Sequence, residues 1–434
     1  MANDLMRPPP AAVLSAIRGT VGELIAPTLV GAYRDLRRPN ASAFAGFPVM
    51  EFDPTLPESI ADPYPVLQRI REHPVVVNRK LGVWMLARHE EVHDAARDNL
   101  TFSSIDGIVL RSFPVKAVVF ADPPDHTRLR KAAVPMFTKR AVRDLATGIG
   151  ALAAEGIAPL RGGGVVDLVR TLTVPLPINV IATMLGIPPD QWPAFRSISD
   201  HFAQAFSART VAEMLNQIGG GLPAYVRFRS FIEAEMRSRA AQPADDLITR
   251  LQQAEADGEL SDAEAFLYAL LLLVAGNETT TNLLGILLMK LAQDRDLFEE
   301  LKADRGLIPA AVEEACRWGS PVQWVTRTLN ADHHIGGGAI PRGGRVILFL
   351  AGANRDPAKF ADPDRFDIHR DTTGHLGFGH GLHFCLGAHL ARLEVITAVG
   401  HLLDAVDGLE LAGPVRWGTT PSLQGPVSLP VRAR

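Results

Sequence analysis

Apolar and polar residues recur with a helical period through the middle of the chain, from residue 122 to about residue 320. Turn residues interrupt the pattern at residues 162–164, 175, 188–189 and 243. Amphipathic and buried helices place apolar residues three and four positions apart, whereas Gly and Pro mark the turns between them. The pattern therefore predicts a succession of helices that makes up the main body of the protein.

The most apolar stretch lies at residues 266–289 and reads FLYALLLLVAGNETTTNLLGILLM. A helix of that length, at ~1.5 Å per residue, would cross the ~30 Å core of a bilayer. However, Asn277, Glu278 and three threonines stand in its middle. An ionisable residue at that depth costs roughly 2.5–3.5 kcal/mol in lipid. We therefore expect a long helix through the centre of the protein; a transporter built on it would need further spans, which the pattern does not indicate.

Short strands are predicted on both sides of this helical region. The first pair stands between expected helices at residues 63–73 and 89–99, and a turn at residues 336–338 lies within the second group. Residues 100–121 show no period and predict a loop long enough to be functional. A last long helix is expected to start near Cys385. The predicted strands are residues 75–78, 82–87, 321–329 and 345–351.

The expected fold is therefore mainly α with a minor β-sheet region. No internal repeat and no Gly/Ser linker separates two halves of the chain. We expect one large domain at residues 46–434 behind an N-terminal extension at residues 1–45. With 434 residues, 47% of them hydrophobic, the chain has enough apolar material for a large core.

Charge and cysteine content narrow the class of protein. The 48 acidic and 44 basic residues give a formal net charge of −4, so no global basic field attracts nucleic acid or an anionic membrane. The two cysteines, Cys316 and Cys385, are too few for a disulfide framework. The N-terminus lacks a basic start followed by an unbroken apolar run. We therefore expect a cytoplasmic protein that binds neither nucleic acid nor membrane.

The most informative window is residues 378–387, FGHGLHFCLG. Gly379 and Gly381 permit tight backbone conformations, so this loop can fold close against a flat cofactor. Cys385 is expected to open a helix, where the helix dipole and free N–H groups favour a thiolate. Gly387 leaves space beneath a macrocycle. A lone intracellular cysteine is usually a buried inert thiol, and that interpretation stays open for the residue taken by itself.

The whole window resembles the cysteine loop of the cytochrome P-450 superfamily. It matches the family pattern of an aromatic residue, glycines, a basic residue, Cys and a final Gly over ten positions, and the likeness extends from about residue 50 to the C-terminus. The resemblance implies the P-450 fold around a buried haem b (iron protoporphyrin IX). It also implies that the Cys385 thiolate is the iron ligand. Phe378, Gly379 and Ala275 would then lie beside the cofactor.

A second group of residues, Ala275-Gly276-Asn277-Glu278-Thr279-Thr280, lies in the long apolar helix. Reduction of dioxygen needs protons, which an acid and a hydroxyl in succession can supply. A Thr hydroxyl can also bond back to a carbonyl and open the helix locally. An amphipathic helix with a solvated acid explains the string as well. By resemblance, Thr279 is the proton-delivering alcohol and Glu278 its acid partner.

Two further sets of residues are implied by the same resemblance. Glu314 and Arg317 stand three apart on one helix face, and Arg365 would complete a buried network that locks the cysteine loop. Cys316 in that helix is expected to be plain core. Haem propionates need cationic partners, although exposed charges on a helix are the simpler interpretation of two of the candidates. The expected propionate partners are His126, Arg130, Arg327 and His383.

These expectations lead to a haem-thiolate monooxygenase that inserts one oxygen atom of O2 into an apolar small molecule. No flavin or nicotinamide fingerprint is present, so electrons are expected from a ferredoxin and an NAD(P)H-dependent ferredoxin reductase. We expect a monomer. The alternative from another class is a haem-based ligand sensor or carrier without turnover, for which the acid and the alcohol would have no use. Basic residues that could face the ferredoxin are Arg128, Lys131, Lys139, Arg140 and Arg392.

The substrate itself is not specified by the sequence. The pocket is expected to draw on the loop at residues 100–121, the long helix and the strand after Pro321. These side chains are apolar, which favours a hydrophobic compound, and no charged anchor can be named. The expected pocket residues are Ile105, Ile108, Val109, Val274, Val322 and Val325.

Overall fold

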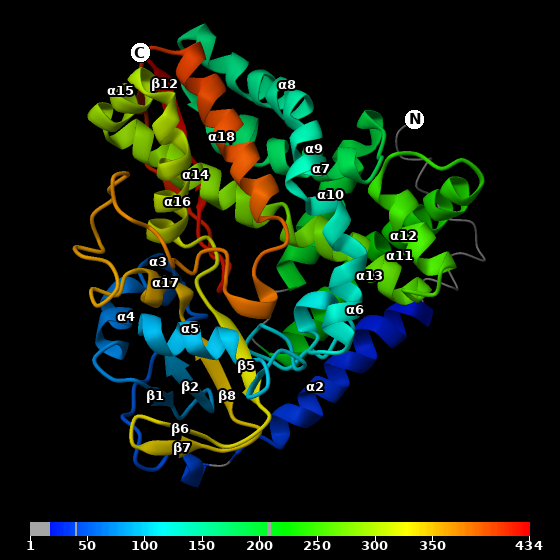
Figure 1. Ribbon diagram of the computed structural model, residues 1–434, viewed down its shortest axis with the longest axis vertical. Helices are drawn as coiled ribbons and strands as arrows, with labels where there is room; N and C mark the ends of the chain where they lie inside the picture. Colours follow the sequence, from blue (N-terminus) through cyan, green and yellow to red (C-terminus); the bar gives the residue numbers. More distant parts are fainter. Residues whose placement is uncertain (1–17, 40, 206–209) are drawn as a thin grey trace.

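The computed structural model describes residues 18–39, 41–205 and 210–434 of the chain. Helices fill the upper and right-hand parts of the view in Figure 1, and a mixed β-sheet lies at the lower left. The mainly helical class with a minor sheet is thus confirmed. The helices up to α12 are α2 (Ala26–Leu36), α3 (Pro57–Ala61), α4 (Tyr64–Ile70), α5 (His89–Arg97), α6 (Asp125–Ala133), α7 (Lys139–Asp144), α8 (Ala146–Ile157), α9 (Pro175–Met184), α10 (Trp192–Ala205), α11 (Val211–Ala241) and α12 (Leu247–Ala256).

The remaining helices surround the centre of the protein. The predicted long helix is two helices, α13 and α14, which are separated at Gly276 and Asn277. Ser261 and Glu264 form a capping box that fixes the start of α13, because each side chain satisfies a free backbone N–H of the other. These helices are α13 (Asp262–Ala275), α14 (Glu278–Gln293), α15 (Arg295–Ala303), α16 (Ile308–Gly319), α17 (Leu350–Asn354) and α18 (Ala388–Ala405).

The main sheet has five strands in the order β1-β2-β8-β5-β3. Its central pairing is parallel between β2 and β8, with Trp84 opposite Val346, and β5 continues the sheet antiparallel to β8. Every residue of β2 and β8 is buried, which explains why both strands are apolar except for Arg345 at the start of β8. The strands are β1 (Val76–Asn78), β2 (Val83–Leu86), β3 (Phe102–Ser103), β5 (Val325–Leu329) and β8 (Arg345–Leu348).

Several smaller pairings were not predicted. Strands β9 to β12 form near the C-terminus, where the apolar runs are too short to show a clear period. A hairpin of β6 and β7 uses the expected turn around Gly336. The small strands are β4 (Val166–Asp167), β6 (His333–Ile335), β7 (Gly338–Ile340), β9 (Leu409–Leu411), β10 (Arg416–Trp417), β11 (Pro426–Ser428) and β12 (Pro430–Ala433).

The largest hydrophobic core lies around α14, whose side chains Leu284, Ile286 and Leu287 are fully buried. The region from Asp262 to Gln293 is the one helical stretch in the described residues that is long and apolar enough to cross a membrane. Its most apolar window is largely buried inside the protein, as expected for a core helix. The transporter hypothesis therefore gains no support from this segment.

Candidate active site

The cysteine loop, residues 378–387, is a tight turn that directly precedes α18 in the chain. In Figure 1 it is the orange segment at the centre of the view, between α18 above and α5 below. The backbone N–H of Cys385 donates to the Phe378 carbonyl over 2.8 Å. Gly379 and Gly381 have positive φ angles of 72° and 66°. A Cβ on Gly381 would lie 2.8 Å from the Ala96 carbonyl oxygen of α5, so both the conformation and the close approach require glycine.

The Cys385 thiol is exposed, yet burial raises its pKa. A sulfur that faces a recess inside the protein, rather than the outer surface, would account for both its exposure and its raised pKa. A backbone hydrogen bond from Gly387 and the nearby Arg130 and Arg392 act in the opposite direction and favour the thiolate. The helix itself begins at Ala388, so Cys385 precedes α18 instead of opening it. By contrast, Cys316 is buried, and burial raises the pKa of its thiol well above the usual range.

A polar network supports the loop from the side of α16. The Arg392 guanidinium donates to both carboxylate oxygens of Glu313, over 2.5 and 2.8 Å, and lies 4.3 Å from the centroid of the Phe378 ring. His375 lies 3.0 Å from the same carboxylate. Burial raises the pKa of Glu313, but the hydrogen bonds from Arg392 and His375 outweigh it and bring it to about 2.

The buried network below the loop has a different third member from the one expected. Glu314 and Arg317 are fully buried and paired through two hydrogen bonds of 2.7 and 2.8 Å. The Arg365 side chain is exposed, and only its carbonyl accepts from Arg317. Instead, Arg370 places its Nε 3.5 Å from Glu314. The expectation for Arg365 was wrong because its position turns its side chain outward, while Arg370, five residues later, returns toward the helix.

The acid and the alcohol lie where the core helix is interrupted. The Thr279 hydroxyl donates to the Ala275 carbonyl over 2.9 Å, as the sequence predicted for a locally opened helix. Ala275 is exposed although the residues of α13 around it are largely buried, so this side of the break faces an open space. Glu278 accepts a hydrogen bond from Thr420, 3.2 Å away in the C-terminal segment. Gly276 fits tightly, because a Cβ there would lie 2.8 Å from Ile181.

Four cationic candidates from three separate segments come together beside the cysteine loop. The His126 and His383 rings are 4.6 Å apart. Burial lowers the pKa of His383 to about 2, and the positive charges of Arg327, His126 and Arg130 add to the effect. Arg130 donates to the Phe384 carbonyl over 2.8 Å, and Arg327 to the Thr326 carbonyl over 2.8 Å. The side chains that the sequence predicted to act together are therefore neighbours.

This cluster lacks anions to match its charge. Within the described part of the chain, none of the four forms an ion pair with a carboxylate, and both ring nitrogens of the buried His126 have no hydrogen-bond partner. Burial lowers the pKa of Arg327 to about 10, and Asp122, itself bonded to Ser104 N–H, compensates only in part. Burial lowers the pKa of both His126 and His383, so these rings would act as neutral hydrogen-bond donors, whereas Arg130 and Arg327 keep their charge. Two arginines and an unbonded buried imidazole fit a ligand that carries carboxylates. The residues therefore fit the two propionates of a haem.

The apolar pocket candidates lie around the same region with different exposure. Ile105 is 48% exposed, whereas Val109 is 8% exposed. Their loop is tied to β5, since Thr326 N–H donates to the Ile108 carbonyl and the Thr326 hydroxyl to the Val109 carbonyl. Val274, Val322 and Val325 are half-buried. These positions are compatible with a lining role, which stays a prediction.

Sequence reasoning missed Arg345, which organises this loop. Its guanidinium is 1% exposed and donates to the carbonyls of Gly107 and Val109 over 2.8 and 2.6 Å. Burial lowers the pKa of Arg345 to about 9. Its only signal in the sequence is a charged residue at the start of a fully apolar strand. Ser104, which lies 3.1 Å from His383, carries no local signal.

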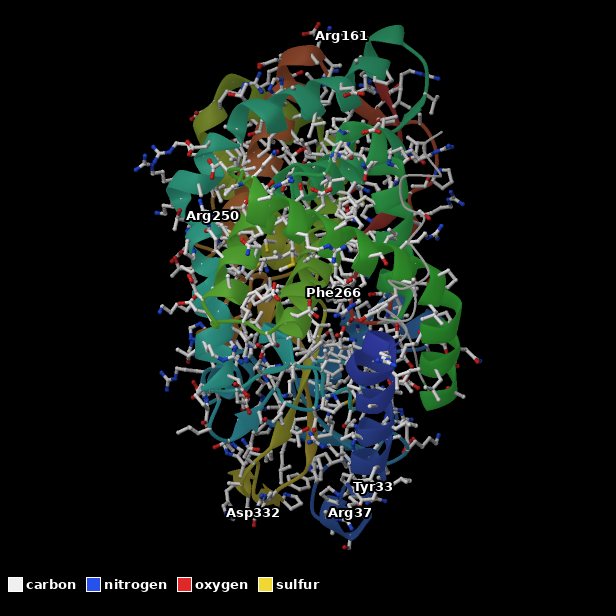
Figure 2. All side chains as sticks on the ribbon, turned by 90° about the vertical axis from the view of Figure 1, so that its right-hand side faces the viewer. Tyr33, Arg37, Arg161, Arg250, Phe266 and Asp332 are labelled. Atoms are coloured by element: carbon white, nitrogen blue, oxygen red, sulfur yellow. The ribbon has the colours of Figure 1, made fainter. Side chains whose placement is uncertain are left out.

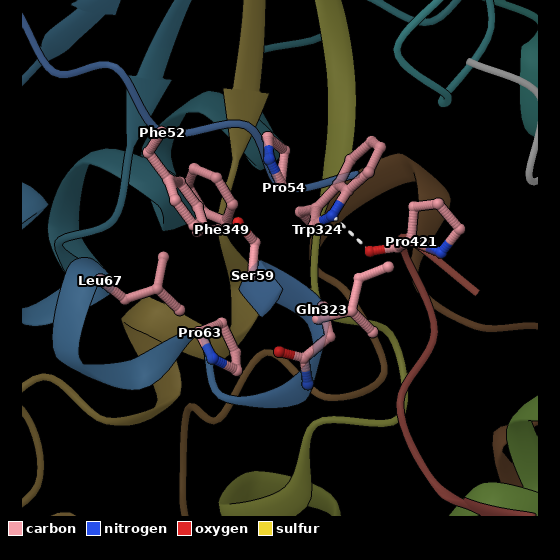
Figure 3. A pocket seen from close by; sticks show the side chains of 10 residues that line it. Phe52, Pro54, Ser59, Pro63, Leu67, Gln323, Trp324, Phe349 and Pro421 are labelled. Carbon is pink, nitrogen blue, oxygen red and sulfur yellow. Dashed lines mark hydrogen bonds between the residues drawn. The ribbon is translucent and has the colours of Figure 1, made fainter. Parts of the chain in front are cut away.

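A separate apolar hollow lies away from these residues (Figure 3). It is lined by aromatic and proline side chains such as Phe52, Phe349 and Pro421, and Trp324 donates to the Pro421 carbonyl across 2.8 Å. It contains no acid, base or thiol, so the candidate chemistry lies elsewhere. In the part of the chain that is described, no cluster of three or more His, Cys, Asp or Glu side chains suits a metal ion. An iron held by Cys385 would thus need further ligands from a macrocycle.

An accessible thiol in a glycine-rich loop, a helix break with a bonded threonine, and two arginines beside an unbonded buried imidazole together form the type of site that a haem-thiolate protein requires. The cytochrome P450 family model matches residues 224–407. Cytochrome P450 107B1 of Saccharopolyspora erythraea is 36% identical over 387 residues, which cover 84% of this chain and 93% of that protein. The beta-dihydromenaquinone-9 omega-hydroxylase of Mycobacterium bovis is 33% identical and covers 86% of this chain and 77% of that protein.

Solved structures agree with the sequence relatives. Cytochrome P450 CYP109Q5 from Chondromyces apiculatus superposes with a TM-score of 0.78 at 35% identity, over 88% of this chain and 98% of that chain. The chain therefore belongs to the cytochrome P450 family. It is an oxidoreductase with a haem cofactor, as the resemblance of the cysteine loop predicted. The alternative of a sensor or carrier without turnover gains no support from these comparisons.

Proposed function

We propose that this chain is a monooxygenase that inserts one oxygen atom into an apolar small molecule at haem b. One observation carries the proposal: the accessible Cys385 thiol lies near Arg130 and close to a buried His126 ring whose two nitrogens have no partner. When bound, haem supplies the activation of dioxygen and the transfer of oxygen. The protein holds that group, excludes bulk water from it and delivers protons.

Each predicted residue has a role toward the cofactor. Cys385 would ligate the iron as a thiolate, helped by the Gly387 N–H. Phe378, Gly379 and Ala275 would flank the ring. The propionates would pair with the Arg130 and Arg327 guanidinium groups and accept hydrogen bonds from the His126 and His383 rings. Glu314 and Arg317, with Arg370 in the place expected for Arg365, hold the base of the loop.

Proton delivery would run through Thr279 and Glu278. The Thr279 hydroxyl donates to the Ala275 carbonyl, which leaves its lone pairs free to accept a proton; it would pass its own proton on after this bond breaks. Glu278 lies next to it in the chain and accepts from Thr420, which fixes one of its carboxylate oxygens. A half-buried acid at a helix break can exchange protons with solvent and still reach the interior.

The substrate class and the partners belong to the same proposal. The apolar pocket candidates favour a hydrophobic compound, and the related Mycobacterium bovis protein is named a beta-dihydromenaquinone-9 omega-hydroxylase. Electrons would come from a ferredoxin and its NAD(P)H-dependent reductase, with the chain acting as a cytoplasmic monomer and residues 46–434 as the catalytic unit. Three of the five predicted docking cations form ion pairs within the chain: Arg128 with Glu264, Lys131 with Glu259 and Arg392 with Glu313. Docking would therefore rely mainly on Lys139 and Arg140.

The ligand assignment is tested with Cys385→Ser and a matched Cys316→Ser control. We expect the reduced carbon monoxide complex of the Cys385 variant to lose the absorption band typical of a thiolate ligand. The Cys316 variant should keep it, because that thiol is buried core. If the Cys385 variant keeps the band, or if the control loses it, the assignment is wrong.

The proton path is tested separately with Thr279→Ala. Haem binding should persist, while reducing equivalents appear as peroxide instead of oxidised product. Thr279→Ser keeps the hydroxyl and should restore most of the coupling. Equal coupling in the wild type and the alanine variant would remove Thr279 from the path.

A further inference from the structure

In the N-terminal helical segment, large apolar side chains face outward and the acidic side chains face the protein. This segment runs through a π-helical stretch, η1 (Val21–Ile25), directly into α2, and Figure 1 shows α2 along the lower right edge of the molecule. Of the twelve large apolar residues recorded as exposed in the described chain, five lie here within sixteen positions. They are Val21 (49%), Leu29 (55%), Val30 (45%), Tyr33 (54%) and Leu36 (86%).

The spacing of these residues places them on one side of the helix. Leu29, Tyr33 and Leu36 follow one another at intervals of four and three positions, which brings them onto a single face. In Figure 2 the labelled Tyr33 and Arg37 lie on α2 at the front of the molecule. We call Val21, Leu29, Val30, Tyr33 and Leu36 the α2 stripe. An apolar surface of this kind on a protein marks an interaction site.

The polar residues of the same segment point the other way, into the protein. Glu23 is bonded to Arg229 and Tyr225 of α11, and Asp35 to Arg38 and to the Ser112 backbone. Both acids are only about a tenth exposed, with side-chain exposures of 11% and 10%. Arg34 pairs with Asp106 in the loop at residues 100–121. Gly31 sits against the same loop, because a Cβ there would collide with the Ser112 backbone.

The exposed charges of residues 18–39 themselves are positive. Arg18 and Arg37 are exposed, and the Arg37 guanidinium lies 4.7 Å from the centroid of the Tyr33 ring. The two acids of residues 18–39 are both bonded inward, so no carboxylate of this segment opposes an anionic surface. An apolar helix face with Tyr and Arg at its border is the pattern of helices that lie in the plane of an anionic bilayer. A protein groove would instead be expected to supply acids for these arginines.

We infer that the α2 stripe docks the protein peripherally on an anionic lipid surface. The expectation of no membrane contact rested on the net charge of the whole chain, whereas docking depends on the local arrangement of one helix. Because α2 is bonded to the loop through Asp106, Leu110 and Ser112, docking brings the predicted substrate loop to the lipid surface. If the proposed preference for apolar substrates holds, such compounds enter from the bilayer.

The test is co-sedimentation of the haem-loaded full chain with vesicles of neutral phosphatidylcholine, or of phosphatidylcholine with about a third phosphatidylglycerol. We expect binding to the anionic vesicles that weakens with salt. The double variant Leu29→Glu/Leu36→Glu should reduce it by about tenfold or more, because both side chains leave the lipid. The matched control Leu100→Glu/Val427→Glu changes two equally exposed apolar residues elsewhere, at 81% and 51% exposure, and should bind like the wild type.

Three results would overturn the inference. The wild type does not bind anionic vesicles; the control loses as much binding as the α2 variant; or the wild type forms a dimer at micromolar concentration that the α2 variant breaks, which would make the stripe a contact between copies. The thiolate spectrum is recorded for all variants and should be identical. A failure of docking is thereby separated from a failure of the proposed chemistry.

Discussion

The part of the site around Cys385, the cysteine side, and the part formed by residues 100–121, the loop side, are held by different kinds of contact. Around Cys385 the polar contacts connect side chains that belong to recognisable sequence motifs, and Glu314 and Arg317 pair three residues apart in complete burial. The loop at residues 100–121 is held by backbone carbonyls that accept from Arg345 and Arg38, which are distant in the sequence. The cysteine side thus combines one local buried pair with longer-range ion pairs between side chains, such as Arg392 with Glu313, whereas the loop side depends on arginines that donate to backbone carbonyls.

The largest effect should come from breaking the buried pair on the cysteine side. Glu314→Ala leaves the Arg317 charge without its partner in a dry interior, which costs about 3–5 kcal/mol of unfolding free energy. Urea denaturation monitored by circular dichroism measures it. The exposed pair of Arg295 and Glu299 serves as the control, since Glu299→Ala should cost less than about 1 kcal/mol. Equal losses in the two variants would contradict the contrast.

Removing Arg345 should loosen the loop at residues 100–121 without affecting the part of the site around Cys385. Arg345→Met removes a donor from each of the Gly107 and Val109 carbonyls, of which Val109 keeps the Thr326 hydroxyl, at a cost of about 1–3 kcal/mol. We expect faster proteolysis within residues 100–121 while the thiolate spectrum is kept. Arg342→Met, at an exposed position of the same segment, is the control. If the spectrum is lost together with the loop, the two sides are not independent.

A pH dependence should mark the network of Glu313, Arg392 and His375. The pKa of Glu313 is about 2 in the folded protein, below its usual value of 4.5. Its contribution is therefore complete above about pH 4.5 and is lost as the pH falls toward 2. Glu313→Gln should destabilise the protein by about 1–3 kcal/mol at pH 6, and the difference should shrink between pH 5 and pH 3. A difference that stays constant over this range would show that the carboxylate charge does not matter.

The smallest effect is expected at the acid of the helix break. Thr420→Val removes one hydrogen bond to Glu278, which is worth about 1 kcal/mol and corresponds to a change of about two- to tenfold. We expect a modest rise in the fraction of electrons lost as peroxide and a larger solvent isotope effect on turnover. The neighbouring exposed Thr419→Val should leave both unchanged.

Much of the fold was predictable, because long periodic segments and continuous apolar strands carry strong local signals. The helical middle, the family and four of the five strands of the main sheet were predicted on that basis, and Thr279 bonds to Ala275 as expected. The fifth strand, β3, lies in the segment that was predicted as a loop. The break of the core helix into α13 and α14 was expected only as a local opening. Strands β9 to β12 went unpredicted, since two to four residues in length leave no measurable period.

The errors within the site have one physical cause. Arg365 and Arg370 are alike as residues, and only the path of the chain decides which one reaches Glu314. Arg345 and Ser104 act on groups more than two hundred residues away, so no local pattern identifies them. The propionate candidates were predicted as a set because a family pattern, rather than their own spacing, connects them. Their roles stay predictions.

The close approach of Gly381 to α5 has a mechanical consequence. Helix α5 follows β2 directly, β2 is aligned in parallel with β8, and β8 pairs with β5, which carries Arg327 and Val325. The position of the Cys385 sulfur relative to β5 therefore depends on how the cysteine loop packs on α5 and on the sheet that follows. A bulkier residue at position 381 would push the cysteine loop away from α5 and so displace the bound cofactor, even though it touches none of the reacting atoms.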